Sequence, residues 1–130
     1  MRSDCAIAGT LDLVGDRWSL LIVRDLLFQE ELRFADLAAA AEGVPTNTLA
    51  DRLRRLEEAG IVAREAYSDR PVRYRYRLTD RGRDLAPILD AMGNWGVKHL
   101  PGTRKLWITR HAVDGAPVPS EVPGSVIPRE

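Results

Sequence analysis

The spacing of apolar residues changes from a helical period to a strand period at Gly60, and this change constrains the fold more than any other feature. Before it, apolar positions recur at i, i+4 and i+7, as in an amphipathic helix: Leu49, Leu53 and Leu56. After it, residues 61–67 and 72–78 alternate with period two around a polar turn, which predicts a β-hairpin. A helix that leads directly into a hairpin indicates a mixed α+β domain.

The N-terminal part of the chain carries two further helical patterns. Apolar residues in the segment 6–14 predict a short helix that Gly15 stops. Asp16 is placed to cap a second helix, over residues 16–28, whose apolar stripe would be buried.

A short extended link, residues 32–34, separates these helices from an alanine-rich helix that Gly43 ends. After the hairpin, Thr79 is expected to cap a last long helix. Pro87 lies within that helix, which is therefore either kinked at the proline or begins properly near it.

Two successive helices joined by a tight turn and followed by an arginine-rich hairpin form a winged helix-turn-helix. The predicted fold is therefore mainly α with a small β-hairpin. We expect residues 1–100 to form one DNA-binding and dimerisation domain, and residues 101–130 a proline-rich C-terminal tail.

Charge is distributed unevenly along a chain whose formal net charge is +0. Residues 1–51 contain four basic and nine acidic side chains, whereas residues 52–83 contain ten arginines, no lysine and five acids. Guanidinium groups offer a rigid fork of donors that suits phosphates and base edges. A solvated face with internal ion pairs would explain the same composition, so charge alone leaves both interpretations open.

The helix that starts near Thr46 has the polar face expected of a DNA-recognition helix. Asn47, Asp51, Arg54 and Arg55 lie opposite its leucine stripe, and Thr48 and Arg52 lie at its flanks. In a helix-turn-helix the second helix enters the major groove, with its N-terminal residues nearest the bases. Asparagine can pair bidentately with adenine and arginine with guanine, so Asn47 and Arg52 could read sequence.

The remaining candidates contact the backbone or orient a neighbour. Threonine hydroxyls can bond phosphates, and Asp51 could accept from cytosine or orient Arg55. Arg70, at the hairpin tip, suits a minor-groove or phosphate contact, and Arg73 is a weaker candidate. The predicted DNA-contacting residues are Thr46, Asn47, Thr48, Asp51, Arg52, Arg55, Arg70 and Arg73.

Several segments together resemble the HxlR-type bacterial winged-helix transcriptional regulators. They are GDRWSLLIVRDLL, LRFADL, GVPTNTLADRLRRLEEAGIVARE, YRLTDRGRDLAPIL and NWG, and they extend from about Cys5 to Trp95. Pro45 departs from the pattern, since the family usually has serine or a similar cap there. The resemblance implies a homodimeric DNA-binding regulator whose recognition helix starts at about Thr46, and whose first and last helices build the dimer interface.

The end helices also contain more apolar residues than one small core needs. The candidates for a dimer interface are Ile7, Leu11, Leu89, Met92 and Trp95. Two recognition helices related by a two-fold axis imply an inverted-repeat operator in double-stranded DNA.

Cys5 is the only cysteine, which excludes an internal disulfide and a cysteine-rich zinc site and suits a reducing cytoplasm. The N-terminus of the first helix, with Arg2, would favour its thiolate, whereas Asp4 opposes ionisation. Some members of the resembled family sense oxidants or electrophiles with a cysteine at this point. Cys5 is therefore either a redox or electrophile sensor that controls DNA release, or a small packing residue, and a small-molecule effector is an alternative trigger for release.

Other classes of function find little support in the sequence. We find no paired nucleophile and base, phosphate loop or metal-ligand cluster, so no enzyme, cofactor or metal site is expected; His99 and His111 are isolated. No apolar run is long enough for a membrane span, and no export signal is recognised, which predicts a cytoplasmic protein. The remaining alternative is a winged-helix module for protein–protein contacts without specific DNA binding.

Overall fold

The computed structural model describes residues 4–40 and 42–104. The helix α1 (Ala6–Val14) lies where the sequence predicts it, and α2 (Ser19–Phe28) starts three residues later than the predicted helix over residues 16–28. Trp18 occupies the N-cap position, and the Asp16 carboxylate, two residues earlier, accepts hydrogen bonds from the backbone N–H groups of Trp18 and Ser19 at 3.0 and 3.1 Å, so Asp16 still satisfies the start of α2.

The helix-turn-helix consists of α3 (Phe34–Ala38) and α4 (Thr46–Glu58). The helix α3 is shorter than the alanine-rich sequence predicts. It ends at Ala38, and a turn then leads to α4. The helix α4 begins at Thr46, as expected, and Gly60 follows its end with a positive φ of 76°.

The sheet has three antiparallel strands rather than a hairpin alone. Strands β2 (Val62–Asp69) and β3 (Val72–Leu78) form the predicted hairpin, in register from Val62 opposite Leu78 to Asp69 opposite Val72, with a bulge at Tyr67. The predicted extended link contains β1 (Leu32–Arg33), which pairs with the other edge of β3 and gives the strand order β1-β3-β2. A two-residue strand carries no periodicity of its own, so its pairing could not be read from the sequence.

The last helical segment is divided in two. Thr79 caps the short helix α5 (Asp80–Arg83) by accepting a hydrogen bond from the Gly82 N–H at 3.1 Å. The long helix α6 (Ala86–His99) then starts with Pro87 in its first turn, where a proline costs no hydrogen bond. Of the two predicted alternatives, the new start near Pro87 is therefore confirmed.

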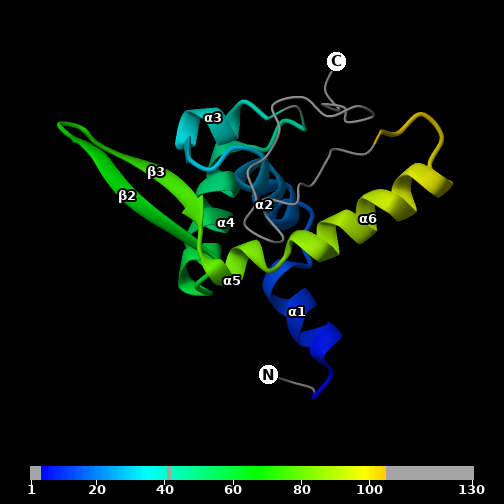
Figure 1. The fold of residues 1–130 in the computed structure, drawn as a ribbon. Coiled ribbons are helices and arrows are strands. Elements are labelled where there is room, and N and C mark those ends of the chain that lie inside the picture. Colours follow the sequence, from blue (N-terminus) through cyan, green and yellow to red (C-terminus); the bar gives the residue numbers. More distant parts are fainter. Residues whose placement is uncertain (1–3, 41, 105–130) are drawn as a thin grey trace.

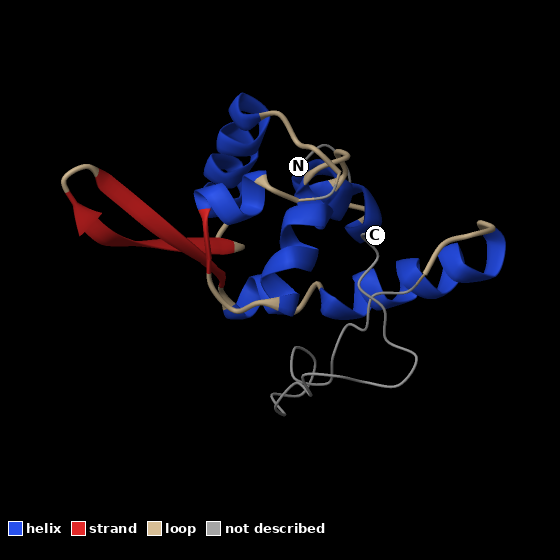
Figure 2. Ribbon diagram, turned by 90° about the horizontal axis from the view of Figure 1, so that it is seen from above, coloured by secondary structure: helices blue, strands red, loops and turns tan. Residues whose placement is uncertain are grey.

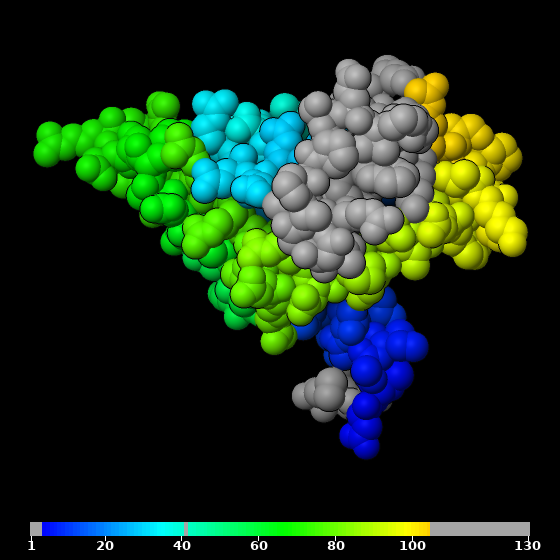
Figure 3. Space-filling view, viewed as in Figure 1, coloured from blue at the N-terminus to red at the C-terminus, as the bar shows by residue number. Residues whose placement is uncertain are grey.

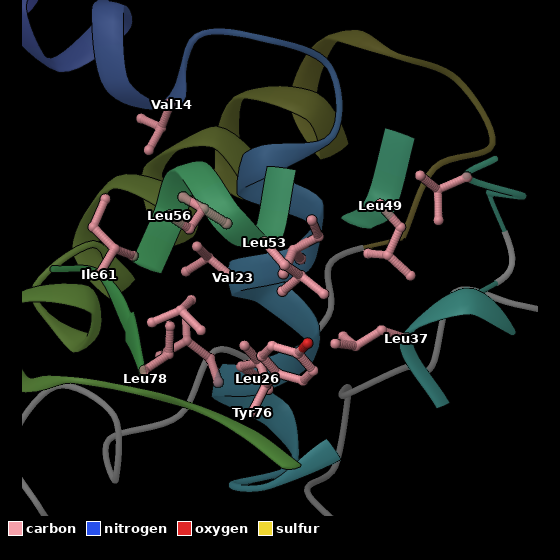
Figure 4. Close-up of a cluster of buried hydrophobic side chains, with 14 of the residues drawn as sticks. Val14, Val23, Leu26, Leu37, Leu49, Leu53, Leu56, Ile61, Tyr76 and Leu78 are labelled. Atoms are coloured by element: carbon pink, nitrogen blue, oxygen red, sulfur yellow. The ribbon is translucent and has the colours of Figure 1, made fainter. Parts of the chain in front are cut away.

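The core lies where α2, α4 and the inner face of the sheet meet, and Figure 4 shows leucines of α4 facing residues of α2 and β3. Leu49, Leu53 and Leu56, the stripe that the sequence predicts, are each 2% exposed or less. Within the described residues, no helix is long and apolar enough to cross a bilayer.

Three elements project from this helical body. Figures 1 and 2 show the hairpin β2–β3 extending away on one side and α6 extending on the opposite side. Figure 3 shows α1, in blue, protruding from the described molecule. The predicted tail beyond residue 104, including His111, lies outside the described residues, as does Arg2.

Candidate nucleic-acid interface

The first turn of α4 is open to solvent. Thr46 and Asn47 are exposed and Thr48 is half-buried, while Leu49 anchors the turn in the core. Pro45 occupies the N-cap position and has no side-chain acceptor, so no capping side chain accepts from the first N–H groups of α4. Such an uncapped helix start can donate to phosphate oxygens.

Asp51 contacts all three arginines of α4. Its Oδ1 accepts a hydrogen bond from Arg54, and its Oδ2 lies 3.2 Å from Nε of Arg55 and contacts Arg52. Partial burial acts to raise the pKa of Asp51, but the hydrogen bond from Arg54 and the charges of Arg55 and Arg52 lower it. Asp51 therefore pairs with Arg55 as a carboxylate, a geometry that is compatible with the orienting role that the sequence allowed.

Arg52 lies at the edge of this face, with its guanidinium between the carboxylates of Asp16 and Asp51. Its Nε donates to Asp16 Oδ2 at 2.9 Å, and its side chain is 22% exposed. The side chains of Arg54 and Arg55 are 58% and 63% exposed. Arg52 is thus the least accessible of the three α4 arginines.

Some arginines of the hairpin contact aromatic rings or an acidic side chain, whereas others are exposed and unpaired within the described residues. Arg64 lies over the Tyr74 ring at 4.1 Å and 3.3 Å from Glu57 of α4, and Arg75 lies over the Tyr67 ring at 4.6 Å. Arg70 and Arg73 are exposed, and in the described part of the chain no acidic side chain pairs with them. These two wing arginines are therefore available to an external anion.

An ion pair that the sequence did not indicate holds the turn before α4. Arg24 of α2 is buried and donates from both terminal nitrogens to Glu42, each at 2.8 Å, and from Nε to Asp25 at 2.9 Å. Burial tends to lower the pKa of Arg24, but hydrogen bonds and charge from Glu42 and Asp25 raise it above its ordinary value. The sequence gives no sign of this pair, because Arg24 and Glu42 lie far apart along the chain. The two parallel hydrogen bonds in the structure reveal it.

The apolar stripes of the end helices begin in the core and continue into solvent. On α1, Val14 is buried, whereas Leu11 and Ile7 on the same face are 58% and 72% exposed. On α6, Leu89 is half-buried against the core, whereas Met92 and Trp95 are 53% and 61% exposed. The sequence analysis missed four further exposed apolar side chains in or next to these helices: Leu13, Ile88, Val97 and Leu100.

Cys5 occupies the residue that precedes α1, and it is exposed. Its carbonyl accepts the hydrogen bond from the Gly9 N–H at 3.0 Å, which starts the helix. Cys5 therefore lies at the outer end of α1, beyond Ile7, and its side chain is exposed.

Comparison with known proteins assigns this architecture to a family. The family model of the HxlR-like helix-turn-helix matches residues 13–104, which include α2 to α6 and the hairpin. The chain belongs to the HxlR-like helix-turn-helix family. The resemblance stated from the sequence motifs is thereby confirmed.

The HxlR-like relatives are named as transcriptional regulators. The uncharacterised HTH-type transcriptional regulator Rv3095 of Mycobacterium tuberculosis is 44% identical over 96 residues, which are 74% of this chain and 60% of that protein. The chain thus spans less than two thirds of the length of this relative.

Solved structures show the same winged helix-turn-helix fold. The transcription-factor candidate PA1607 superposes with a TM-score of 0.71 at 36% identity, covering 95% of this chain and 89% of that one. The redox regulator HypR in its oxidised form superposes with a TM-score of 0.63 at 33% identity, covering 73% and 97%. The HxlR-like fold of this chain is therefore shared with regulators, one of them redox-responsive.

Proposed function

We propose that this HxlR-like protein is a transcriptional regulator that binds an inverted-repeat operator in double-stranded DNA as a homodimer. The observation that carries the proposal is the exposed polar face of α4 together with the exposed arginines of the wing. This set comprises the first turn of α4, Arg54 and Arg55 beside Asp51, and the two wing arginines, Arg70 and Arg73, that have no acidic partner among the described residues. Membership in a family of named transcriptional regulators supports the same function.

In this proposal α4 lies in the major groove and the wing reaches the adjacent backbone or minor groove. Asn47 reads a base edge, with adenine as the matching partner, and Arg55 reaches guanine or a phosphate. Thr46 and Thr48 donate to phosphates at the helix start, together with the backbone N–H groups of that turn. Arg70 and Arg73 supply charge that fixes the register of the protein on the duplex.

The homodimer is proposed from the two stripes that run out of the core. Among the described residues, eight of the nine exposed large apolar side chains lie on α1, on α6 or at Leu100, which ends α6. An exposed apolar surface of this kind is typical of a protein–protein interface. Because closed dimers are usually two-fold symmetric, each α1 and α6 would pack on its counterparts.

The function is tested by selecting bound duplexes from a random DNA library. We expect the selected sequences to converge on an inverted repeat with half-site centres about one helical turn, or a multiple of it, apart. Affinity should fall steeply between about 50 mM and about 200 mM salt. Asn47→Ala should relax the sequence preference at one position in each half-site, at a cost of about 1–3 kcal/mol.

Failure to enrich any sequence, together with binding that does not depend on salt, would contradict the proposal. That result would favour the protein–protein interaction module instead.

Release of DNA in response to an oxidant or electrophile is part of the proposal. Its support is the exposed position of Cys5 at the outer end of α1 and the fold shared with the redox regulator HypR. Diamide takes up two protons and two electrons from two thiols, so Cys5 would form a disulfide with the other subunit's Cys5 or with a small thiol. We expect diamide to weaken operator binding by the wild type and not by Cys5→Ser. Equal, oxidant-insensitive binding by both proteins would contradict this role.

A further inference from the structure

One carboxylate connects the end of α1, the start of α2 and the middle of α4. Asp16 follows Gly15, the residue at which α1 ends. Its Oδ1 accepts from the Ser19 hydroxyl at 2.5 Å, and its Oδ2 accepts from two backbone N–H groups at the start of α2. The same Oδ2 accepts from Arg52 Nε, across 36 positions of sequence.

From these contacts we infer that Arg52 is a positioning residue. Its ion pair with Asp16 fixes α4 against the corner between α1 and α2, so that Asn47 and Arg55 meet DNA in the correct register. This inference rests on the proposed DNA binding. It assigns Arg52 a different task from the base reading that its residue type predicts.

Three observations separate Arg52 from the arginines that are open to DNA. Its side chain is 22% exposed and its partner Asp16 is 29% exposed, against 63% for Arg55. Its Nε and a terminal nitrogen are both occupied, by Asp16 and Asp51. Reading a guanine bidentately takes two guanidinium nitrogens, so Arg52 would have to release at least one of these two carboxylates, and release of Asp16 would leave that half-buried carboxylate without its cation.

The ion pair between Asp16 and Arg52, here called the bridge, is also connected through Asp51 to the arginines that are proposed to contact DNA. Asp51 contacts Arg52 on one side and Arg54 and Arg55 on the other, so the rotamer of Arg52 influences how Asp51 orients Arg55. Asp16 follows Gly15, the residue that caps the end of α1, so the ion pair ties the proposed recognition helix to the loop that follows the proposed dimer helix.

The test compares Arg52→Gln, Asp16→Asn and the double variant on a duplex selected by the wild-type protein, with Arg55→Gln as the matched control. Removing a direct phosphate contact lowers the slope of log affinity against log salt by about 1, and we expect this of Arg55→Gln. We expect Arg52→Gln to lower affinity about tenfold with the slope unchanged.

Asp16→Asn separates a purely electrostatic effect on DNA binding from the loss of the ion pair, because the two predict changes in opposite directions. Loss of a negative charge near DNA should tighten binding if electrostatics alone acted, whereas loss of the bridge should weaken it about tenfold. The double variant has the net charge of the wild type, and it should bind no more weakly than either single variant.

A slope lowered by about 1 in Arg52→Gln, with Asp16→Asn binding as tightly as the wild type, would overturn the inference, because Arg52 would then contact DNA itself. Amide hydrogen exchange on the free protein provides a second readout, and α4 should exchange faster in both single variants. Unchanged exchange in both would also overturn the inference. A wild-type protein that selects no duplex would refute the proposed function, while the exchange measurement would still decide whether the bridge holds α4.

Discussion

Gly82 of α5 lies so close to Ile61 and Leu78 that the helix can pack there only without a side chain at this position. A Cβ at this position would collide with the carbonyl oxygen of Ile61 and press on the Leu78 side chain at 3.0 Å. Ile61 and Leu78 are both buried, so neither has free space into which it could move. The absence of a side chain at Gly82 is therefore a packing requirement of the fold.

Gly82→Ala should lower the free energy of unfolding by about 1–3 kcal/mol, as overpacking does in a filled core. Gly96→Ala is the control, because its Cβ would meet only the Leu100 side chain at an ordinary 3.8 Å. In a helix interior that change should leave stability unchanged or raise it by up to about 1 kcal/mol. Urea unfolding of both variants checks the contrast, and equal stabilities would refute the packing argument.

At the scale of elements, the hairpin both supports the fold and presents charge. Its base is held by Arg64, which contacts Glu57 of α4, and by the buried residues Tyr76 and Leu78. Toward the tip, Arg70 and Arg73 extend into solvent, where Val72 beside them is 55% exposed. The wing is therefore anchored at one end and open at the other.

Arg73→Gln should weaken binding to every duplex by a similar factor and lower the salt slope by about 1, because a phosphate contact carries no sequence information. Arg75→Gln is the matched control on the same strand, since that guanidinium covers the Tyr67 ring. We expect Arg75→Gln to change the slope less. Titrations at several salt concentrations would show this, and identical slopes for the two variants would contradict it.

The α6 stripe makes a separate prediction about assembly. Met92→Glu would bury an unpaired charge on each side of the proposed two-fold interface, so the dimer dissociation constant should rise at least about 30-fold, or about 2 kcal/mol. Asn94→Glu adds the same charge at another exposed position of α6 and should leave the dimer intact. Light scattering across a dilution series measures both. A wild type that is monomeric at micromolar concentration would contradict the homodimer.

At the scale of the whole molecule, the free energy of unfolding includes a contribution from carboxylates that are ionised in the folded state. Partial burial acts to raise the pKa of Asp16, but hydrogen bonds from Ser19, Trp18 and Arg52 outweigh it and hold the pKa below its ordinary value. Hydrogen bonds from Arg33 likewise lower the pKa of Asp36. A lowered folded-state pKa contributes stability above the unfolded value of about 3.9, and this is lost as pH falls through the folded pKa.

We therefore expect Asp16→Asn to be less stable than the wild type by about 1 kcal/mol near neutral pH, because asparagine can still cap the helix start but lacks the charge that pairs with Arg52 and with the helix N-terminus. This difference should shrink below about pH 4, because the wild-type carboxyl is then protonated as well. Urea unfolding between about pH 3 and about pH 7 measures the two curves. A difference that stays constant to the acid limit would show that ionised Asp16 is not what stabilises the fold.

The sequence alone determined the elements whose local signals are strong. The leucine stripe of α4, the alternation of the hairpin and the caps Asp16 and Thr79 each depend on residues close together in the chain. Local hydrogen bonding and helical or strand periodicity therefore suffice to predict them. The order of these elements predicted the winged helix-turn-helix, and the motifs added the resemblance to the HxlR family, which the family match then confirmed.

Only the tertiary structure decided how distant residues are used. The strand β1 exists because β3 offers it an edge, and α3 ends early although alanine favours helix, since the turn that follows carries Glu42 to the buried Arg24. Arg52 has the residue type and position of a base reader, yet its guanidinium is held by Asp16. Such pairings join residues far apart in sequence, and no periodicity or local propensity records which acid an arginine will reach.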